Sequence, residues 1–273
     1  MIHDLKIRLK ILLIVFFGIM FLGTIGFMFI ENKSVIDAAY YVVVTIATVG
    51  YGDIHPVTQV GKIFAIALIV SGVGTFLGVI ANFTEIMLAR REIQIRMEKL
   101  NMVIGVFFSE VGLNILSIFT RCDAQCDMIR PELVVTAAWK EKDFRRAKKD
   151  LSQYNYTIDI GNIDIDGLKS FFMSKRDFLV GLLENPVLLE HQSFTDLLRA
   201  VFHLAEELAY REDLKNILQT DKDHLSTDAK RAYTYLVSEW LDYLKYLKNN
   251  YPFLFSLAMR INPLDPESSV VVK

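Results

Sequence analysis

The residues of this chain best suited to chemistry form one short run, residues 48–53, with the sequence TVGYGD. Gly50 and Gly52 can adopt positive φ at little steric cost, so successive backbone carbonyls can point in one direction. Carbonyl oxygens from several copies of such a run, directed at one axis, can replace the water shell of a cation. The run therefore predicts a cation path built from backbone oxygen atoms.

The remaining reactive residue types do not form a comparable pattern. Cys122 and Cys126 stand four residues apart, with no second pair of Cys or His at the distance that a zinc finger needs, so we interpret them as ordinary thiols. His191, His203 and His224 are expected to be isolated. No nucleophile, general base or phosphate-binding loop emerges, and the chain is not expected to be an enzyme.

An acidic run at residues 159–167, DIGNIDIDG, follows the first half of a calcium-binding loop. The twelfth position of such a loop requires a bidentate glutamate, and Met173 occupies it here. We expect instead a turn in which Asp166 caps a helix from Gly167 to Glu184. A metal site is therefore not predicted in this run.

Two segments are apolar enough to cross a membrane. Residues 11–30 contain no charge over 20 positions, about the length of helix that spans a bilayer. Residues 60–89 form a second span, which has no charged residue between Lys62 near its start and Glu85. Basic residues lie beside the spans at Lys6, Arg8, Lys10, Arg90, Arg91, Arg96 and Lys99. Because basic flanks stay in the cytoplasm, we expect a multi-pass protein of the cell membrane with both termini cytoplasmic. A net charge of -2 favours no nucleic-acid partner.

Between the spans, a short helix must position the TVGYGD run. Ser34 can cap it, Asp37 complements its dipole, and residues 35–46 are apolar enough to be buried. About three turns cannot cross a bilayer, so this segment is expected to enter the membrane and end midway. Non-helical backbone at that depth is tolerated only where it is buried in protein or lines a water-filled path.

The run from Thr48 to Gly52 resembles the selectivity filter of potassium channels. The wider run from Thr45 to Asp53 resembles the pore of the archaeal calcium-gated two-span channels, and the likeness covers roughly residues 5–90. The resemblance implies ion sites made by the carbonyls and the threonine hydroxyl of Thr48, Val49, Gly50, Tyr51 and Gly52. It also implies a homotetramer in the lipid bilayer, with potassium ions as the permeant species and no other metal or cofactor.

The same resemblance implies roles for residues around the filter. Tyr41 stands where the family often has a tryptophan that donates a hydrogen bond to the filter aspartate, here Asp53. Gly72 matches the position of the gating-hinge glycine. The residues implied to face the cavity or the inner gate are Val73, Phe76 and Leu77.

The sequence after the second span is expected to be all-α, so the whole chain is predicted as all-α. We expect a pore domain at residues 1–90, a helical cytoplasmic domain at 91–262 and a flexible tail at 263–273. The expected helices are 91–121, 131–153, 167–184 and 197–210, with a capping box at 193–196. A stripe at helical spacing, expected to lie in a core or in a subunit interface, consists of Tyr233, Val237, Trp240, Leu244 and Leu247. The dinucleotide-binding regulatory domain of the resembled channels is not expected, because its glycine fingerprint is missing.

These patterns predict a potassium-selective channel with passive conduction, gated by bending of the second span coupled to the helical domain. One alternative is the pore subunit of a coupled potassium uptake transporter, although those proteins have degenerate filters and several pore repeats per chain. Another is a membrane-anchored signalling module. The gating stimulus is not indicated by any motif, which leaves room for an unidentified cytoplasmic ligand or partner protein.

Overall fold

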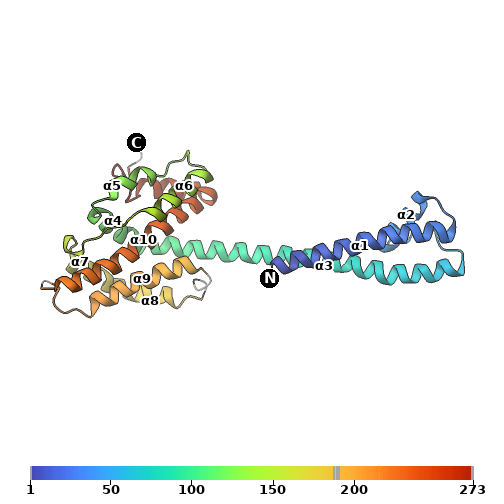
Figure 1. The fold of residues 1–273 in the computed structure, drawn as a ribbon, viewed down its shortest axis with the longest axis horizontal. Coiled ribbons are helices and arrows are strands. Elements are labelled where there is room, and N and C mark those ends of the chain that lie inside the picture. The colour runs from blue at the N-terminus through green and yellow to red at the C-terminus, as the bar shows by residue number, and fades with distance from the viewer. Residues whose placement is uncertain (1, 187, 189–190, 215, 272–273) are drawn as a thin grey trace. The chain divides into compact units, whose positions relative to one another are not determined.

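The fold is seen in a computed structural model, which describes residues 2–186, 188, 191–214 and 216–271. The described residues contain helices and no strand, so the all-α prediction is confirmed (Figure 1). The chain divides into two compact units, an N-terminal unit (Met1–Ile95) and a C-terminal unit (Arg96–Lys273). The boundary falls within the long helix α3 (Gln59–Phe107).

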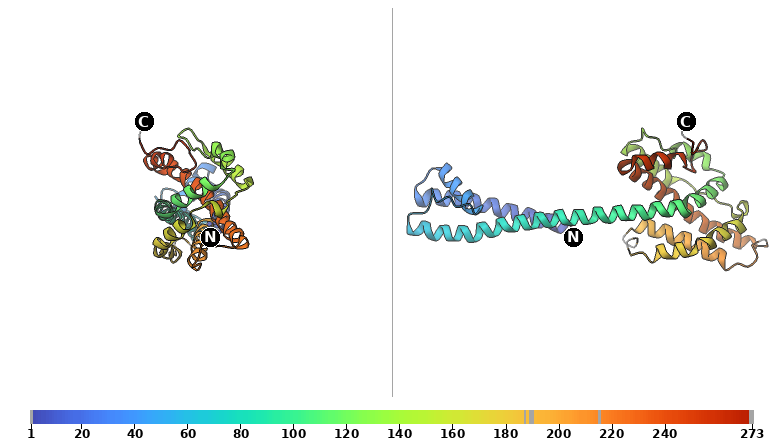
Figure 2. Two further views of the ribbon diagram at one scale, coloured as in Figure 1. Left: turned by 90° about the vertical axis from the view of Figure 1, so that its left-hand side faces the viewer. Right: turned by 180° about the vertical axis from the view of Figure 1, so that it is seen from behind.

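The N-terminal unit contains α1 (Ile2–Glu31), α2 (Val35–Ile46) and most of α3. α1 and the helical run that begins at Gln59 are long and apolar enough to cross a membrane. They lie side by side in opposite directions, and α2 packs against α1 (Figures 1 and 2). The residues buried where the three helices meet are Phe27, Ala38, Tyr41, Val42, Ile46, Ala65 and Leu68. Both predicted spans and the short helix between them are therefore helical in the structure.

Local hydrogen bonds set the ends of these helices. Asn32, with φ of 55°, adopts the left-handed conformation that commonly ends a helix, directly after α1. Ser34 caps α2 by accepting a hydrogen bond from the Asp37 amide at 3.1 Å, as predicted. Glu31 Oε1 accepts hydrogen bonds from the amide and the hydroxyl of Thr58 at 3.0 and 2.8 Å. These last bonds tie the end of α1 to the start of α3.

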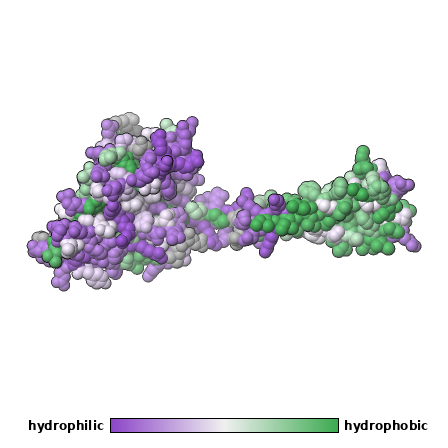
Figure 3. Space-filling view, viewed as in Figure 1, coloured by the Kyte–Doolittle hydropathy of each residue, from purple (hydrophilic) through white to green (hydrophobic). Residues whose placement is uncertain are grey.

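The surfaces of the two units differ in polarity. The surface of the N-terminal unit is mainly hydrophobic and that of the C-terminal unit mainly hydrophilic (Figure 3). Large side chains exposed on α1 and α3 include Ile14, Phe17, Phe21, Leu22, Phe29, Ile63, Ile66 and Val70. Exposing so many apolar groups to water is unfavourable, so this unit requires lipid or other protein around it.

The C-terminal unit is a helical domain. It contains the end of α3, the π-helix η1 (Phe108–Gly112), α4 (Leu113–Cys122), α5 (Cys126–Ile129), η2 (Arg130–Glu132), α6 (Glu141–Gln153), η3 (Ile160–Asn162), α7 (Ile165–Ser174), α8 (Arg176–Leu183), α9 (Gln192–Ala209), α10 (Gln219–Asn250) and α11 (Pro252–Arg260). α9 and α10 lie side by side and form the main helix pair of this unit (Figures 1 and 2). The predicted stripe on α10 is buried at all five positions, Tyr233, Val237, Trp240, Leu244 and Leu247.

The predicted helix over residues 91–121 is present but changes type in its middle. Helical structure continues from α3 into α4 through the π-helix η1. A π-turn takes one more residue than an α-turn, which rotates the following side chains. Phe107 and Phe108 are both buried, and the Phe108 ring lies 5.0 Å from that of Trp240. The π-turn therefore lets two consecutive aromatic rings enter one core.

Two of the predicted helices have different bounds in the structure. The helix expected from Pro131 begins at Glu141 instead, because residues 133–140 follow an irregular path that buries Leu133 and Val135. The helix expected over residues 167–184 begins at Ile165 and is broken at Lys175 into α7 and α8. Buried contacts distant in sequence thus decide where these helices begin.

The capping predictions in this unit also need correction. Asp164, not Asp166, caps α7 by accepting a hydrogen bond from the Gly167 amide at 3.0 Å. Asp159 makes the equivalent bond to the Gly161 amide at 2.8 Å. The acidic run at 159–167 therefore caps two short helices, which accounts for its composition without calcium.

The start of α9 and the expected tail differ from prediction as well. α9 begins at Gln192 instead of Leu197, and its cap is His191, whose Nδ1 accepts a hydrogen bond from the Phe194 amide at 3.3 Å. The tail expected from residue 263 is partly packed, since Leu264 is buried in the core. Arg260 also donates to the Val270 carbonyl at 2.6 Å. Residues 272 and 273 lie outside the described residues.

The cysteines behave as core thiols. Both are free, Cys126 is buried, and Cys122 is half-buried. Burial raises the pKa of each thiol above its ordinary value, so both remain protonated and unreactive at neutral pH.

Candidate functional site

The TVGYGD loop is anchored to the end of α2. The Val44 carbonyl in the last turn of this helix accepts hydrogen bonds from the amides of Val49 and Gly50, at 3.0 and 3.3 Å. The Thr48 amide donates to the Thr45 carbonyl at 3.1 Å. These bonds satisfy carbonyls that a helix end leaves unpaired, and they hold the first half of the loop at the helix terminus.

The backbone of the loop alternates in handedness. Positive φ angles occur at Thr48 (60°), Gly50 (56°) and Gly52 (79°), whereas the intervening Val49 and Tyr51 do not have them. Alternation of right- and left-handed residues turns successive peptide groups to the same side of the chain. Gly50 and Gly52 adopt this backbone without strain, while a β-branched residue such as Thr48 does so at a cost. The arrangement can present carbonyl oxygens to a cation.

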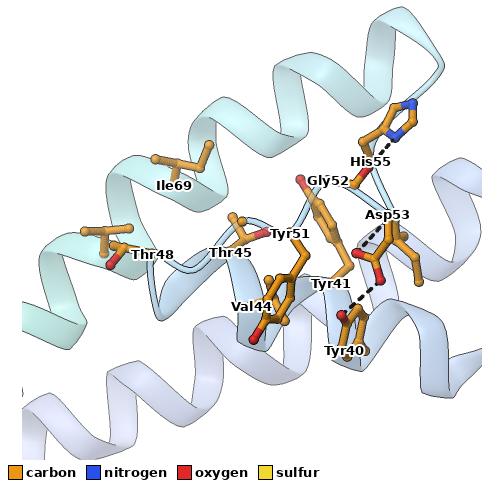
Figure 4. Close-up of a pocket in the computed structure, with 13 residues that line it drawn as sticks. Tyr40, Tyr41, Val44, Thr45, Thr48, Tyr51, Gly52, Asp53, His55 and Ile69 are labelled. Atoms are coloured by element: carbon orange, nitrogen blue, oxygen red, sulfur yellow. Dashed lines mark hydrogen bonds between the residues drawn. The ribbon is translucent and has the colours of Figure 1, made fainter.

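Asp53 fixes the other end of the loop (Figure 4). Its Oδ2 accepts a hydrogen bond from the Tyr40 hydroxyl at 2.9 Å, and its Oδ1 accepts one from the Ile54 amide at 3.0 Å. With Nδ1 protonated, His55 donates to the Gly52 carbonyl at 3.2 Å. The Asp53 end of the loop is thus held by the Tyr40 and His55 side chains and by the Asp53 carboxylate itself.

The hydrogen bond to Asp53 is donated by Tyr40 and not by Tyr41, so the sequence analysis named the wrong tyrosine. Tyr41 is 6% exposed, and its ring stacks on Phe27 of α1 with the centroids 3.9 Å apart. Consecutive residues of a helix differ in direction by about 100°. Tyr41 therefore faces α1, while Tyr40 faces the loop.

A pocket of about 370 Å³ lies between α2, the TVGYGD loop and α3 (Figure 4). Its lining includes Tyr40, Tyr41, Val44, Thr45, Thr48, Gly50, Tyr51, Gly52, Asp53, Ile54, His55, Ile69 and Val73. Val49 and Tyr51 are 52% and 72% exposed. More than half of each of these side chains is therefore exposed in a single chain.

The residues expected to form the gate lie in an unbroken part of α3. A Cβ atom at Gly72 would meet Ile46 Cγ1 at 2.6 Å, so the glycine lets α3 approach the end of α2. Phe76 stacks on Phe16 of α1 with the ring centroids 6.0 Å apart, whereas Leu77 is 57% exposed. Phe76 therefore packs between the two spans, whereas Val73 lines the pocket and Leu77 is exposed. The hinge and gate roles remain predictions.

Sequence reasoning missed three members of this site. Tyr40 and His55 hold the loop, and Glu31 ties α1 to the residue before α3. Tyr40 could have been found from the sequence. Asp53 lies beyond the end of α2, so a hydrogen bond to it requires a long side chain with a hydroxyl group, such as tyrosine, on the helix face next to the loop. His55 and Glu31 offered no spacing pattern, since their partners depend on how the loop turns back.

Two antiparallel membrane-length helices, a short helix between them and an anchored glycine-containing loop define the class of two-span ion-channel pores. Residues 14–89 match the family model described as ion channel, and residues 96–260 match the one described as uncharacterized protein MJ1433, C-terminal helical domain. The chain belongs to the MJ1433 C-terminal helical domain family. Its N-terminal unit is a pore domain of the prokaryotic two-span potassium-channel type.

Individual relatives include an uncharacterized protein and potassium channels. Uncharacterized protein MJ1433 of Methanocaldococcus jannaschii is 46% identical over 187 residues, which is 68% of this chain and 75% of that protein. The voltage-gated potassium channel of Aeropyrum pernix is 41% identical over 64 residues, 22% of each chain. Potassium channel protein 1 of M. jannaschii is 40% identical over 81 residues, 29% of this chain and 24% of that protein. The chain thus spans less than a quarter of the length of either channel, and these matches support a potassium-channel function for the pore.

Proposed function

We propose that this chain is the subunit of a potassium-selective channel, assembled as a homotetramer around a TVGYG filter. The observation that carries the proposal is the alternating backbone of the loop, with positive φ at Thr48, Gly50 and Gly52, directly after the end of α2. A cation that leaves water loses its hydration shell, and aligned carbonyl oxygens replace that shell.

The ion sites of the proposed filter are the carbonyl oxygens of residues 48–51 and the Thr48 hydroxyl. Each chain supplies one such column of oxygens, and four chains around an axis complete rings that enclose the ion. The C-terminal end of α2 carries partial negative charge and adds to the attraction for cations. Conduction is proposed to be passive, through sites made of the backbone carbonyls and the Thr48 hydroxyl.

Two observations support the tetramer. The filter side chains Val49 and Tyr51 are largely exposed in one chain, and a symmetric copy of the pore unit is the surface that would bury them. Large apolar side chains are also exposed on both α1 and α3, and a tetramer in a bilayer offers both lipid and neighbouring subunits to cover them. In this assembly, lipid covers α1 and neighbouring subunits cover part of α2, α3 and the filter loop.

Gating is proposed to occur by bending of α3 at Gly72, with Val73 and Leu77 near the inner mouth of the pore. The C-terminal unit begins within this same helix, so a change in that unit has a covalent route to the gate. The protein is placed in the cell membrane with both termini cytoplasmic.

The test is single-channel recording of the purified protein in bilayers with different potassium and sodium concentrations on the two sides. We expect the reversal potential to follow the potassium gradient. Gly52→Ala should abolish conduction, because alanine at a φ of 79° is strained. Gly18→Ala is the matched control, since a Cβ atom at Gly18 meets nothing within 4 Å. A reversal potential that does not separate the two ions would refute the proposal.

A further inference from the structure

The C-terminal unit brings together two histidines that the sequence analysis expected to be isolated. His203 and Glu207 lie four residues apart on α9, and His224 and Asp228 lie four residues apart on α10. Residues at this spacing share one face of a helix. Because α9 and α10 pack side by side, the two faces meet and form one cluster of two imidazoles and two carboxylates.

The ligand atoms of three of these residues, His203, Glu207 and Asp228, all lie within 4.8 Å of one another, and His224 lies beside two of them. Asp228 Oδ2 is 3.3 Å from His203 Nε2 and 3.4 Å from His224 Nε2. Glu207 is 3.8 Å from His203 Nε2 and 3.6 Å from His224 Nε2. Four ligands at about 2.1 Å from a tetrahedral zinc ion lie about 3.4 Å from one another. His203, Glu207 and Asp228 therefore supply three ligand atoms, and a side-chain movement of His224 would bring the fourth.

One carboxylate oxygen of Asp228, Oδ2, lies beside both histidines and accepts no hydrogen bond from the described residues. The residue is 3% exposed. Its Oδ1 accepts one from Arg231 at 3.0 Å, which orients the carboxylate. A buried carboxylate oxygen without a hydrogen bond is costly, and a bound cation would remove that cost.

Glu207 is oriented in a comparable way from the other helix. Arg211 donates to Glu207 Oε2 at 2.7 Å and is itself held by Asp221 at 2.7 Å. Glu207 Oε1, the atom nearer His203, is not used by Arg211. Partners behind the ligands that fix their orientation are typical of protein metal sites.

We propose that His203, Glu207, His224 and Asp228 bind one divalent transition-metal ion, with zinc as the best fit. Two imidazole nitrogens favour zinc and its neighbours, whereas calcium and magnesium prefer sites made entirely of oxygen. The histidine side chains are 46% and 52% exposed, so the ion can enter from solvent. Bound there, it links α9 to α10 in the C-terminal unit. This site is separate from the pore and adds a ligand to the proposed channel.

The test uses the full-length protein without an affinity tag, purified in detergent and treated with a chelator. Zinc affinity is measured by competition with a fluorescent chelator, and cobalt serves as an optical probe because its visible absorption is strong only in a four-coordinate site. We expect one ion per chain, a four-coordinate cobalt spectrum, and a loss of zinc affinity of about tenfold or more in His203→Ala and in His224→Ala. Zinc should also raise the melting temperature of the C-terminal unit. Tryptophan fluorescence follows the unfolding of this unit, because both tryptophans, Trp139 and Trp240, lie in it.

Two control variants separate this site from incidental binding. His3→Ala removes a histidine from the N-terminal unit, and Asp223→Asn removes an exposed carboxylate of α10 that is not in the cluster. Neither should change zinc affinity. Unchanged affinity in both His203→Ala and His224→Ala would overturn the proposal, as would a weak, six-coordinate cobalt spectrum. The cluster would then be a set of ion pairs alone, and zinc would leave the melting temperature unchanged.

Discussion

Asp53 and Val44 hold the two ends of the filter loop by different means. At the α2 end, the Val44 carbonyl binds two loop amides, so the attachment is made by backbone and is insensitive to side-chain identity. At the other end, the Asp53 carboxylate depends on the Tyr40 hydroxyl. The outer end of the filter is therefore the part that a single side-chain change can loosen.

We expect Tyr40→Phe to destabilise the conducting filter. The substitution removes the hydrogen bond that the Tyr40 hydroxyl donates to the Asp53 carboxylate. In patch recordings of the reconstituted channel, the current should decay faster during sustained opening. Tyr41→Phe is the matched control and should leave the decay unchanged, since the Tyr41 ring packs on Phe27. A larger effect of Tyr41→Phe would show that the sequence-based assignment was right.

Glu239 makes the stability of the C-terminal unit depend on pH. It is 3% exposed on α10, its Oε1 accepts no hydrogen bond from described residues, and burial raises its pKa. Above the ordinary glutamate pKa of about 4.3, the folded state retains a proton that the unfolded state has lost. Stability from this group is thus complete below that pH and is lost as pH rises through the folded-state pKa. Ser193, His191, Asp242 and Lys148 also act on this carboxyl group.

Glu239→Gln should therefore be more stable relative to the unsubstituted chain at about pH 7 than at about pH 5. Urea unfolding of the full-length protein, followed by tryptophan fluorescence, measures this difference. Comparing the two chains at each pH cancels the opposite contribution of other carboxylates, such as Glu141 and Asp221, whose pKa values are lowered. Glu184→Gln, at an exposed position, should show no such trend. An equal trend in both variants would contradict the assignment to Glu239.

Helix α3 meets two demands at Gly72. The glycine admits the side chain of Ile46 from the end of α2, and it is also the proposed point of bending. A methyl group at this position would overlap Ile46, so packing alone accounts for a glycine here. The two roles can be separated, because only packing depends on the size of residue 46.

We expect Gly72→Ala to lower both the yield of folded tetramer and the open probability. Adding Ile46→Ala removes the overlap and should restore the tetramer, measured by size-exclusion chromatography in detergent. The open probability in bilayers should stay low in the double variant, because alanine still stiffens the helix. If Ile46→Ala restores both quantities, Gly72 is a packing residue and not a hinge.

At the scale of the whole molecule, the proposed filter and the helical domain lie in different units of the chain. Every hydrogen bond that holds the filter loop joins residues of the N-terminal unit, and the C-terminal unit has its own buried core. Ion selectivity should therefore be independent of the helical domain. The domain is expected to act on the pore through α3.

A chain ending at Ile95 should keep potassium selectivity and lose the normal control of opening. Selectivity is measured from reversal potentials in bilayers, and control of opening from the open probability of the truncated and full-length channels. A truncated channel that conducts potassium and sodium equally would contradict the independence of the filter. An unchanged open probability would contradict coupling to the C-terminal unit.

Much of the pore could be predicted because its signals are local. The bounds of α2 and the Ser34 cap follow from hydrophobicity, helix length and a hydrogen bond over three residues. In the C-terminal unit, helices were expected in most of the right places, but several starts were wrong. Asp164 and Asp166 have equal intrinsic capping ability, and the choice between them depends on how the preceding segment packs.

The sequence by itself determined the membrane spans, the short helix and the filter run, because hydrophobic length and glycine φ preferences act within a few residues. Tertiary structure decided which tyrosine, Tyr40 or Tyr41, reaches Asp53, since the packing of α2 against α1 sets its rotation. It also brought His203 to Asp228 from a separate helix. Contacts between distant segments form only when apolar faces pack together. The spacing of residues along the sequence does not indicate which faces will meet.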